Sequence, residues 1–347
     1  MARVRRTGVL LGVVTVLALV AASCGGESGE AGSADDRGTL TVYSGREEEF
    51  VAPLFEQFEV DTGVQVDVRY GDSAELAATI VEEGDASPAD VFFSQDAGSL
   101  GAVAEAGLFS EIDRDILDRV EERFRSPEGL WVGTSGRGRV AVYNTEVLED
   151  SDLPGSILEF AEPRWEGRIG LPPTNSSFQA HVAAMILTIG EGPTRDWLEG
   201  LMGNGVRFYE DNAATTRAVA SGEIAVGLVN HYYKFEVEAE DGSLPIANHY
   251  FEPGDPGSFV NTAGVGILAS TEHADAARTF IDYVTGEQGQ SWVATETWEY
   301  PLAAGYEPSV DLLSIGRFVG PESQVELSDL GPALPGALEL LAEVGMV

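Results

Sequence analysis

Two adjacent tyrosines, Tyr232 and Tyr233, are the side chains of this sequence whose type and placement best suit binding chemistry. They follow the apolar, β-branched stretch 222–228, which predicts a short buried strand. Neighbouring strand residues point to opposite faces, so both hydroxyls can reach one point only if the backbone leaves strand geometry at Asn230 or just after it. The stretch by itself also fits two rings that only pack, one in the core and one on the surface.

Polar residues also open two of the predicted helices. The loop with Asn175, Ser176 and Ser177 precedes a helix predicted over 178–189, and Asn212 opens another helix. Asparagine and serine at a helix start usually cap it. The free N–H groups at such a start can also bind an anion. Both interpretations, a cap alone and an anion site, stay open.

Motifs for catalysis are not found in the chain. The four histidines form neither an HExxH motif nor a Cys/His cluster, and there is no nucleophile elbow, P-loop or dinucleotide fingerprint. The single cysteine lies in the N-terminal segment, which excludes a thiol nucleophile. His231, beside the tyrosines, fits a base, a ligand or a polar residue at a strand end. We therefore expect a binding protein and not an enzyme.

The N-terminal segment predicts export. Residues 1–23 combine three arginines, an apolar stretch and a small-residue run, which is typical of a signal peptide. Cys24 follows at once, and the arrangement resembles a bacterial lipoprotein signal, in which this cysteine is lipidated. An ordinary cleaved signal with a leftover thiol is the alternative. Residues 24–38 are rich in Gly, Ser, Ala and acids and predict a flexible tether. We expect an extracytoplasmic protein that touches the cell membrane only through its lipid anchor, in the periplasm or at the cell surface.

The composition narrows the class of partner. Asp and Glu number 58 against 20 Lys and Arg, for a formal net charge of −38. Nucleic-acid binding is therefore not expected, because phosphate contact requires a basic surface. Hydrophobic residues make up 44% of the chain, which suffices for a real core with the acids on its exterior.

Strands alternate with helices through the body of the chain. Strands are predicted at 40–43, 64–68, 89–93, 140–143, 168–171 and 263–268, and helices at 48–60, 73–83, 97–106, 178–189, 274–284 and 289–297, with a closing helix in 332–347. This alternation predicts an α/β fold with parallel sheets covered by helices on both faces. Ligands of such sheets bind beyond the carboxyl ends of the strands, which here are 44–47 and 94–96.

Seven fragments along the chain together resemble one family. They are VYSGR at 42–46, SPADVF at 87–92, SGRGRV at 135–140, PRWEGRIG at 163–170, WLEGL at 197–201, NHYY at 230–233 and EYPL at 299–302. Each fragment alone is weak, but the collinear set resembles the bacterial ferric-ion-binding proteins, the solute receptors of iron ABC importers.

The resemblance implies a two-lobed clamp of the type II periplasmic-binding-protein kind. Each lobe would be a doubly wound, mainly parallel sheet with helices on both faces, joined by crossing strands. The lobes would comprise 39–137 with 262–312, and 138–261 with 313–347. Ferric iron would be held between them by Tyr232 and Tyr233, because a hard trivalent cation prefers anionic oxygen and phenolate supplies it.

The resemblance also implies the remaining site residues. Many members have a histidine ligand where this chain has Glu47, and a glutamate where it has Gln95; Glu48 and Asp96 are neighbouring alternatives. Asn175, Ser176 and Ser177 match the family's anion-binding loop. Three further positions, also assigned to anion binding, match the family's supporting asparagines and its cleft arginine: Asn212, Asn230 and Arg137. A synergistic anion, carbonate or phosphate, or water would complete the iron shell.

The implied function is capture of ferric iron and its delivery to an ABC permease with a separate ATPase, by a monomeric receptor. Other interpretations stay open. The same fold could bind a ferric chelate, a small organic anion such as a phosphonate or carboxylate, or a polyamine. An extracytoplasmic enzyme and a structural surface lipoprotein are further alternatives, but neither accounts for the paired tyrosines.

Overall fold

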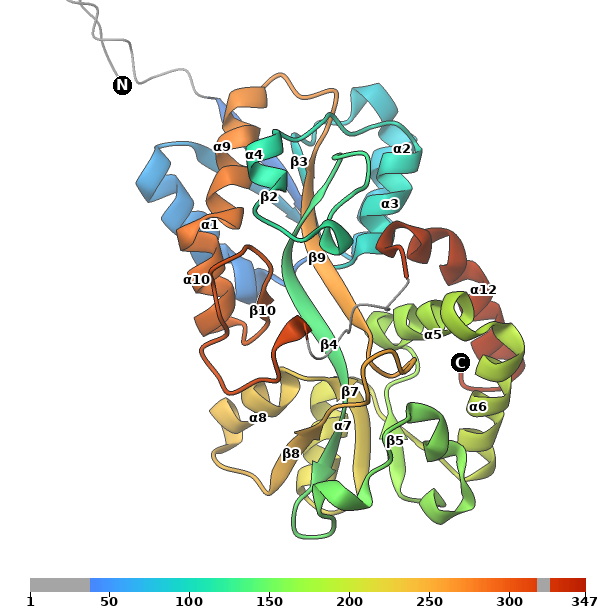
Figure 1. Cartoon of the computed structure of the whole chain (residues 1–347). Helices are drawn as coiled ribbons and strands as arrows, with labels where there is room; N and C mark the ends of the chain where they lie inside the picture. The colour runs from blue at the N-terminus through green and yellow to red at the C-terminus, as the bar shows by residue number, and fades with distance from the viewer. Residues whose placement is uncertain (1–37, 317–324) are drawn as a thin grey trace, which may run out of the picture. The chain divides into compact units, whose positions relative to one another are not determined.

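The computed structural model of the chain describes residues 38–316 and 325–347 (Figure 1). The predicted signal peptide, Cys24 and the tether up to residue 37 lie outside the described residues. Across the two described ranges, no helix combines the length and the apolar character that crossing a bilayer requires.

The first group of strands is parallel and alternates with helices. β1 (Thr39–Ser44) lies between β2 (Gln65–Tyr70) and β3 (Val91–Ser94). The connecting helices are α1 (Glu48–Thr62), α2 (Ser73–Glu83) and α3 (Ala97–Glu105). Asp72 and Asp96 cap α2 and α3 by accepting hydrogen bonds from backbone N–H groups. The carboxyl ends of β1 and β3, which precede the candidate residues Glu47 and Gln95, therefore lie side by side.

Two long strands cross from the first group to the second. β4 (Val132–Asn144) pairs with β9 (Val260–Ile267), and β9 continues the sheet beside β3. β10 (Tyr300–Pro301) adds to β4 opposite Ser135 and Gly136. All these pairings are antiparallel, and Figure 1 shows β4 and β9 running together between the two groups of helices. They are the crossing strands that the family resemblance predicts.

The second group repeats the parallel pattern. β5 (Ile169–Leu171) lies between β6 (Arg207–Phe208) and β7 (Val226–Asn230). The far half of β4 pairs with β7 along one edge and with β8 (Ile246–His249) along the other. Its helices are α5 (Ser176–Ile189), α6 (Glu191–Gly203), α7 (Asn212–Ala220) and α8 (Tyr233–Asp241). Further helices in the described ranges are α4 (Arg114–Leu117), α9 (Ala274–Thr285), α10 (Glu287–Glu296) and α12 (Leu330–Glu343). Short 3-10 helices occur at Gly84–Ala86, Glu122–Phe124, Asp150–Asp152, Ile157–Ala161, Pro163–Trp165 and Leu327–Asp329.

The α/β prediction is confirmed, but several elements differ locally, among them β4, which spans Val132–Asn144 where only 140–143 was predicted. α5 begins at Ser176, two residues before the predicted start, because the side chain of Asn175 accepts a hydrogen bond from the Ser177 N–H and caps the helix there. β7 begins only at Val226, because Gly222 has a left-handed φ of 76° and turns the chain before the strand. The predicted boundaries of the two lobes stay predictions.

Aromatic contacts hold helices that are distant in sequence together on one side of the first group of strands. Phe55 and Phe58 of α1 each place their ring centroid 5.3 Å from that of Phe280 in α9. All three side chains are buried, and each such side chain contributes about 1.5–3 kcal/mol through removal from water. α1, α9 and α10 consequently lie together in Figure 1, with α2 and α3 across the strands from them.

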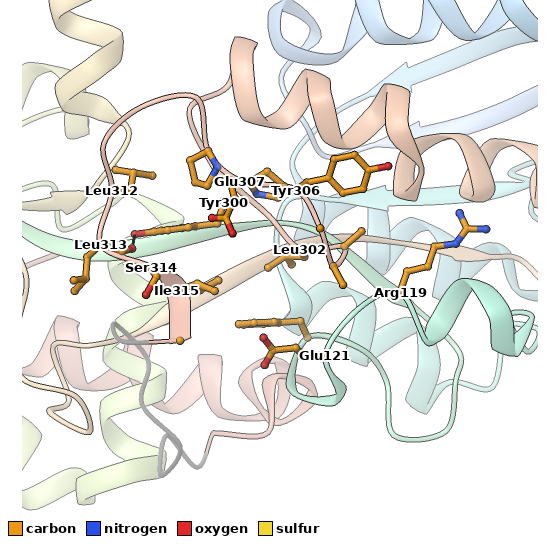
Figure 2. Close-up of a pocket in the computed structure, with 17 residues that line it drawn as sticks. Arg119, Glu121, Tyr300, Leu302, Tyr306, Glu307, Leu312, Leu313, Ser314 and Ile315 are labelled. Atoms are coloured by element: carbon orange, nitrogen blue, oxygen red, sulfur yellow. Dashed lines mark hydrogen bonds between the residues drawn. The ribbon is translucent and has the colours of Figure 1, made fainter.

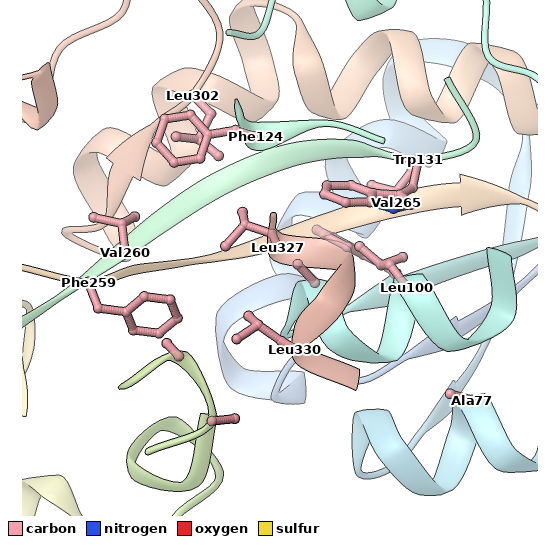
Figure 3. Close-up of a cluster of buried hydrophobic side chains, with 14 of the residues drawn as sticks. Ala77, Leu100, Phe124, Trp131, Phe259, Val260, Val265, Leu302, Leu327 and Leu330 are labelled. Atoms are coloured by element: carbon pink, nitrogen blue, oxygen red, sulfur yellow. The ribbon is translucent and has the colours of Figure 1, made fainter. Parts of the chain in front are cut away.

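The C-terminal helix contacts both groups. α12 packs on α3 at its start and on α5 further along. Figure 3 shows Leu327 and Leu330, at the entry to α12, beside Leu100 of α3 and Val265 of β9. The approach to α3 is close, because a Cβ added to Gly331 would lie 2.5 Å from the carbonyl oxygen of Gly98.

Gly331→Ala should therefore destabilise the protein. The backbone of α3 cannot move aside as a flexible side chain could, so we expect a loss of about 1–3 kcal/mol in the free energy of unfolding. Denaturant unfolding would measure it. Gly336→Ala is the matched control on the same helix, since an added Cβ there meets nothing within 4 Å. Equal stability of the two variants would contradict the close contact.

Candidate metal-binding site

The tyrosine pair lies where β7 turns into α8. β7 ends at Asn230, Tyr232 has helical φ and ψ of −74° and −21°, and α8 begins at Tyr233. The two rings stack with centroids 4.3 Å apart and planes 30° from parallel. The backbone thus leaves strand geometry directly after Asn230, as predicted, and this brings both phenols to one place. Tyr232 is 6% exposed, and Tyr233 is half-buried.

His231 holds this turn and has no nitrogen left for a metal. Its Nδ1 accepts a hydrogen bond from the Gly138 N–H at 3.1 Å, and its Nε2 donates to the Trp298 carbonyl at 3.0 Å. Burial lowers the pKa of His231 to about 4, so the ring is neutral at physiological pH. The structure therefore gives His231 a structural role and excludes it as a ligand in this conformation.

Both phenols resist ionisation in the metal-free protein. Burial, and next the charge of Tyr233, raise the pKa of Tyr232 well above its usual 10. Burial raises the pKa of Tyr233 to about 12, although a hydrogen bond from Tyr232 opposes this shift. The guanidinium of Arg137 lowers the pKa of both phenols. A bound cation would have to displace these protons.

Two carboxylates lie within electrostatic reach of the pair. Glu47, exposed at the start of α1, and Glu236, one turn into α8, both raise the pKa of Tyr233. Burial, and then the charge of Glu47, raise the pKa of Glu236 to about 7. The family resemblance predicted Glu47, whereas Glu236 was not predicted. Its only signal is its spacing of three residues from Tyr233, which places both on one helix face.

The loop of Gln95 is tied to the loop of Glu47. The N–H of Gln95 donates to the Ser73 hydroxyl at 2.9 Å, and an added Cβ on Gly45 would lie 1.9 Å from that same hydroxyl. Only glycine can approach α2 this closely. Arg137 donates to the carbonyl of Gln95. The structure therefore brings both predicted first-lobe ligand loops together and anchors one of them through Arg137.

A buried ion-pair network lies behind these loops. Arg46 donates two hydrogen bonds to the carboxylate of Glu299, at 3.0 and 3.1 Å, and Ser135 donates a third. Nε of Arg137 lies 4.0 Å from the same carboxylate. Burial alone would raise the pKa of Glu299, but Arg46, Arg137 and Ser135 outweigh it and lower that pKa. Arg46 and Glu299 belong to the sequence fragments of the resemblance, yet nothing in the sequence indicated that they meet.

Three of the predicted anion residues, Asn212, Asn230 and Ser177, converge on a second arginine, Arg139. Nη1 of Arg139 donates to Oδ1 of Asn230 at 3.1 Å and to Oδ1 of Asn212 at 3.4 Å. Asn230 donates in turn to the Ser177 hydroxyl at 3.1 Å. Burial lowers the pKa of Arg139 to about 9, so it remains charged at physiological pH. Nδ2 of Asn212 and Nε of Arg139 are buried with no hydrogen-bond partner among the described residues.

Arg139 joins this set because of strand register. Arg139 of β4 lies opposite Asn230 of β7, so the side chains meet across the sheet. Arg137 was the arginine predicted here, and it lies instead at the first-lobe loops. Both act electrostatically on the phenols. Alternation along the strand places both on one face, and only the pairing shows which one meets the asparagines.

Two cavities lie near these residues. One of about 430 Å³ has walls from α2, α3, α5 and α12, and Gly45, Gln95 and Ser176 line it, whereas the tyrosines are not among its described lining residues. A second cavity, of about 250 Å³, is lined by residues 300–308 and 312–316. In Figure 2, Tyr300 lies near Leu313, and the Tyr300 hydroxyl donates a hydrogen bond to the Leu313 carbonyl at 2.8 Å. Two of the charged groups at its rim are already paired, Arg119 with Asp282 and Glu121 with Arg123. We assign no function to the second cavity.

Histidine and carboxylate clusters do not compete with the tyrosine site. Within the described ranges, no group of three or more His, Cys, Asp or Glu side chains could hold a metal. The other histidines bind protein oxygens: His181 that of Pro256, His249 those of Asp150 and Pro154, and His273 that of Asp90. Within the described ranges, a metal site would therefore use the phenol oxygens of Tyr232 and Tyr233 as donors.

The fold and this site define a two-lobed α/β solute-binding protein. The profile of the bacterial extracellular solute-binding protein family matches residues 86–313. The Fe(3+)-binding periplasmic protein of Serratia marcescens is 35% identical, covering 95% of this chain and 97% of the relative. The major ferric iron-binding protein of Neisseria meningitidis serogroup B is 31% identical, covering 82% and 86%. The structure of iron-bound HitA from Pseudomonas aeruginosa superimposes with a TM-score of 0.81 at 34% identity, over 88% of this chain and 99% of HitA.

The chain belongs to the bacterial ferric-ion-binding proteins, a family of extracellular solute-binding proteins. The predicted family, fold class and non-enzymatic nature are confirmed. The individual ligand residues, the lipid anchor and the lobe boundaries stay predictions.

Proposed function

We propose that this protein captures ferric iron outside the cytoplasm through Tyr232 and Tyr233 and delivers it to an ABC permease. The observation that carries the proposal is the stacked, hydrogen-bonded phenol pair within electrostatic reach of Glu47. Phenolate and carboxylate are the hard, anionic oxygen donors that a trivalent cation prefers. The Serratia and Neisseria relatives carry the same ligand in their names, which supports iron as the cargo.

Glu47 is the third proposed ligand, and Gln95 a neutral fourth. Two phenolates and one carboxylate balance the three charges of ferric iron. Glu47 is exposed, so it can turn toward the phenols when the lobes approach. Gln95 offers only a carbonyl oxygen, and its backbone is already anchored by Ser73 and Arg137.

Titration of the purified protein with ferric citrate tests the proposal. Phenolate ligation should produce a visible charge-transfer band that saturates at one iron per protein. A thermal-shift screen with ferric ion, phosphonates, carboxylates and polyamines runs beside it. If one of the organic ligands stabilises the protein, while iron gives neither a charge-transfer band nor a thermal shift, that ligand and not iron would be the cargo.

An anion completes the proposed site. The positive groups near the iron would be the metal itself and three guanidiniums, those of Arg46, Arg137 and Arg139. Ferric iron and the three guanidiniums carry six positive charges, and the two phenolates, Glu47 and Glu299 carry four negative ones. Two positive charges therefore stay unbalanced, or one when Glu236 is ionised. Asn212 and Arg139 supply buried donors without partners among the described residues, at the start of α7 and close to the start of α5. We infer a carbonate, phosphate or organic carboxylate there; a Trichodesmium IdiA (FutA) structure, 29% identical with a TM-score of 0.74, holds iron and citrate.

Asn212→Leu should reduce the dependence of iron binding on the anion. The variant removes both polar groups from a fully buried position, and a hydrogen bond to a charged group contributes about 1.5–3 kcal/mol, so we expect ferric affinity in phosphate to fall about tenfold or more. Titrations with and without phosphate measure it. Thr215→Val, equally buried on the same helix with its hydroxyl bonded to the Asp211 carbonyl, is the control. An unchanged phosphate dependence in Asn212→Leu would exclude this anion site.

A ferric chelate is the second candidate cargo. The 430 Å³ cavity beside Gln95 and Ser176 has largely aliphatic walls, and Val81 and Leu338 at its edge are 45% and 38% exposed. Such a cavity would accept the organic part of a chelate. Co-purification of the organic ligand with iron would favour the chelate over the free ion.

The proposed mechanism is closure of the two lobes on the cargo. Ligand that contacts both lobes stabilises the closed state by its differential affinity for that state. The proposed lobes are 39–137 with 262–312, and 138–261 with 313–347. We propose further that the receptor is monomeric, is anchored through a lipid on Cys24, and docks on a permease whose separate ATPase drives transport.

A further inference from the structure

The backbone is strained at Trp298, beside the proposed metal site. Its φ is 52°, and no other non-glycine residue in the described ranges has a positive φ. For a bulky side chain this conformation is unfavourable, and it persists only where the surroundings impose it.

The strained residue and its two successors contact both sides of the proposed site. The Trp298 carbonyl accepts the hydrogen bond from His231, the residue before Tyr232. The Tyr300 ring lies 4.7 Å from the His231 ring, centroid to centroid. Between these two contacts, the side chain of Glu299 points to the opposite partners, Arg46 and Ser135. Consecutive residues thus contact the tyrosine turn and the first-lobe loops.

Both arginines beside Glu299 lead directly to a proposed ligand loop. Arg46 precedes Glu47 in the chain, and its guanidinium is held at two points. Arg137, 4.0 Å from the same carboxylate, donates to the carbonyl of Gln95. Glu299, Arg46 and Arg137 are 2%, 5% and 1% exposed, so water cannot replace these contacts.

We propose that Glu299, presented by the strained Trp298, is a positioning residue that sets the placement of the Glu47 and Gln95 loops relative to the tyrosine pair. The proposal rests on the ferric-binding function and adds a residue that acts through Arg46 and Arg137 and does not touch the metal.

Charge gives a second reason for an acid at this position. Buried guanidiniums repel a trivalent cation, and removal of one partner of a buried ion pair leaves the other charge uncompensated. Glu299 neutralises one of the two arginines beside the first-lobe loops. Its loss would both release the Glu47 loop and increase the repulsion, and both effects weaken ferric binding.

A double-mutant cycle between Glu299 and Glu47 tests the proposal. Glu299→Gln keeps the shape of the side chain and removes its charge, and we expect ferric affinity to fall about tenfold or more. In a Glu47→Gln background the same change should have a smaller effect, because the loop that it positions no longer contributes a carboxylate. The charge-transfer band of Glu299→Gln should also shift, since the donors around iron are rearranged. Competition with citrate measures the affinities.

Asp90→Asn is the matched control. Asp90 is a carboxylate of similar burial, 4% exposed, that accepts hydrogen bonds from the Thr41 N–H and the Thr271 hydroxyl before β3 begins. It lies at the opposite ends of the parallel strands from the site. Its variant should lower the melting temperature while ferric affinity and the band stay those of the parent protein.

The outcomes separate the two levels of the proposal. Wild-type affinity and band in Glu299→Gln, or additive effects with Glu47→Gln, would overturn the positioning role and leave ferric binding intact. Failure of the parent protein to bind iron would instead remove the proposed function. If circular dichroism shows that Glu299→Gln does not fold, Glu299→Asp is the variant to test, because it keeps the charge and withdraws the carboxylate by one methylene. An unchanged band and an unchanged ferric affinity in Glu299→Asp would overturn the positioning role.

Discussion

Tyr232→Phe and Tyr233→Phe should each remove most of the visible absorption of the ferric complex and weaken ferric binding by at least about a hundredfold, because substitution of residues that only support a metal ligand already costs about 10–100-fold. Phenylalanine keeps the stacked ring and deletes only the oxygen, so the fold should survive. The reason for the large effect is specific to iron(III), which needs anionic oxygen that water or phenylalanine cannot supply at this position. Citrate competition measures the affinity, and the spectrum reports the remaining phenolate.

Tyr283→Phe is the control for these variants. Tyr283 is also a buried tyrosine, 8% exposed, but its hydroxyl donates to Asp61 at 2.8 Å, in contact with α1 and away from the proposed site. This change should cost about 1 kcal/mol of stability and leave iron binding unaltered. Retention of the band and the affinity in both site variants would remove iron from the interpretation of this protein.

Ferric affinity should rise steeply with pH. The pKa of Tyr232 is raised well above 10 and that of Tyr233 to about 12, so both phenols are protonated in the metal-free protein at pH 6–8. Iron binds the phenolates, and each complex therefore releases two protons. By linkage, the apparent affinity for the free ferric ion should increase by up to about a hundredfold for each pH unit in this range.

Glu236 adds to this pH dependence with the same sign. Its pKa is raised to about 7, so the carboxyl is neutral below that pH and ionised above it. The ionised form attracts the cation, and binding strengthens further as pH rises through 7. Acidification should thus release iron, and Glu236→Gln should flatten the profile near pH 7.

Proton counting separates this effect from the chemistry of ferric iron in water. Competition against a chelator of known proton dependence at each pH corrects for hydrolysis of the metal. Tyr232→Phe should release one proton fewer per iron bound. A pH-independent corrected affinity in the parent protein would show that phenolates do not ligate the iron.

The sequence by itself determined the elements and the ends at which ligands gather. Apolar patterning predicted β1, β3 and the helices between them, so Glu47 and Gln95 could be placed at the carboxyl ends of strands. Two adjacent tyrosines after an apolar run required a break in the strand near Asn230, and the chain turns there. These features depend on residues close in sequence, where periodicity and turn chemistry leave a readable pattern.

Tertiary structure alone decided which charged groups meet. Arg46 and Glu299 are separated by 253 positions and His231 and Trp298 by 67, and such contacts leave no periodic signal in one sequence. Alternation along β4 put Arg137 and Arg139 on the same strand face, but only the pairing of β4 with β7 placed Arg139 opposite Asn230. Burial then set the pKa of each group, because the cost of a charge depends on the surroundings that the whole fold creates.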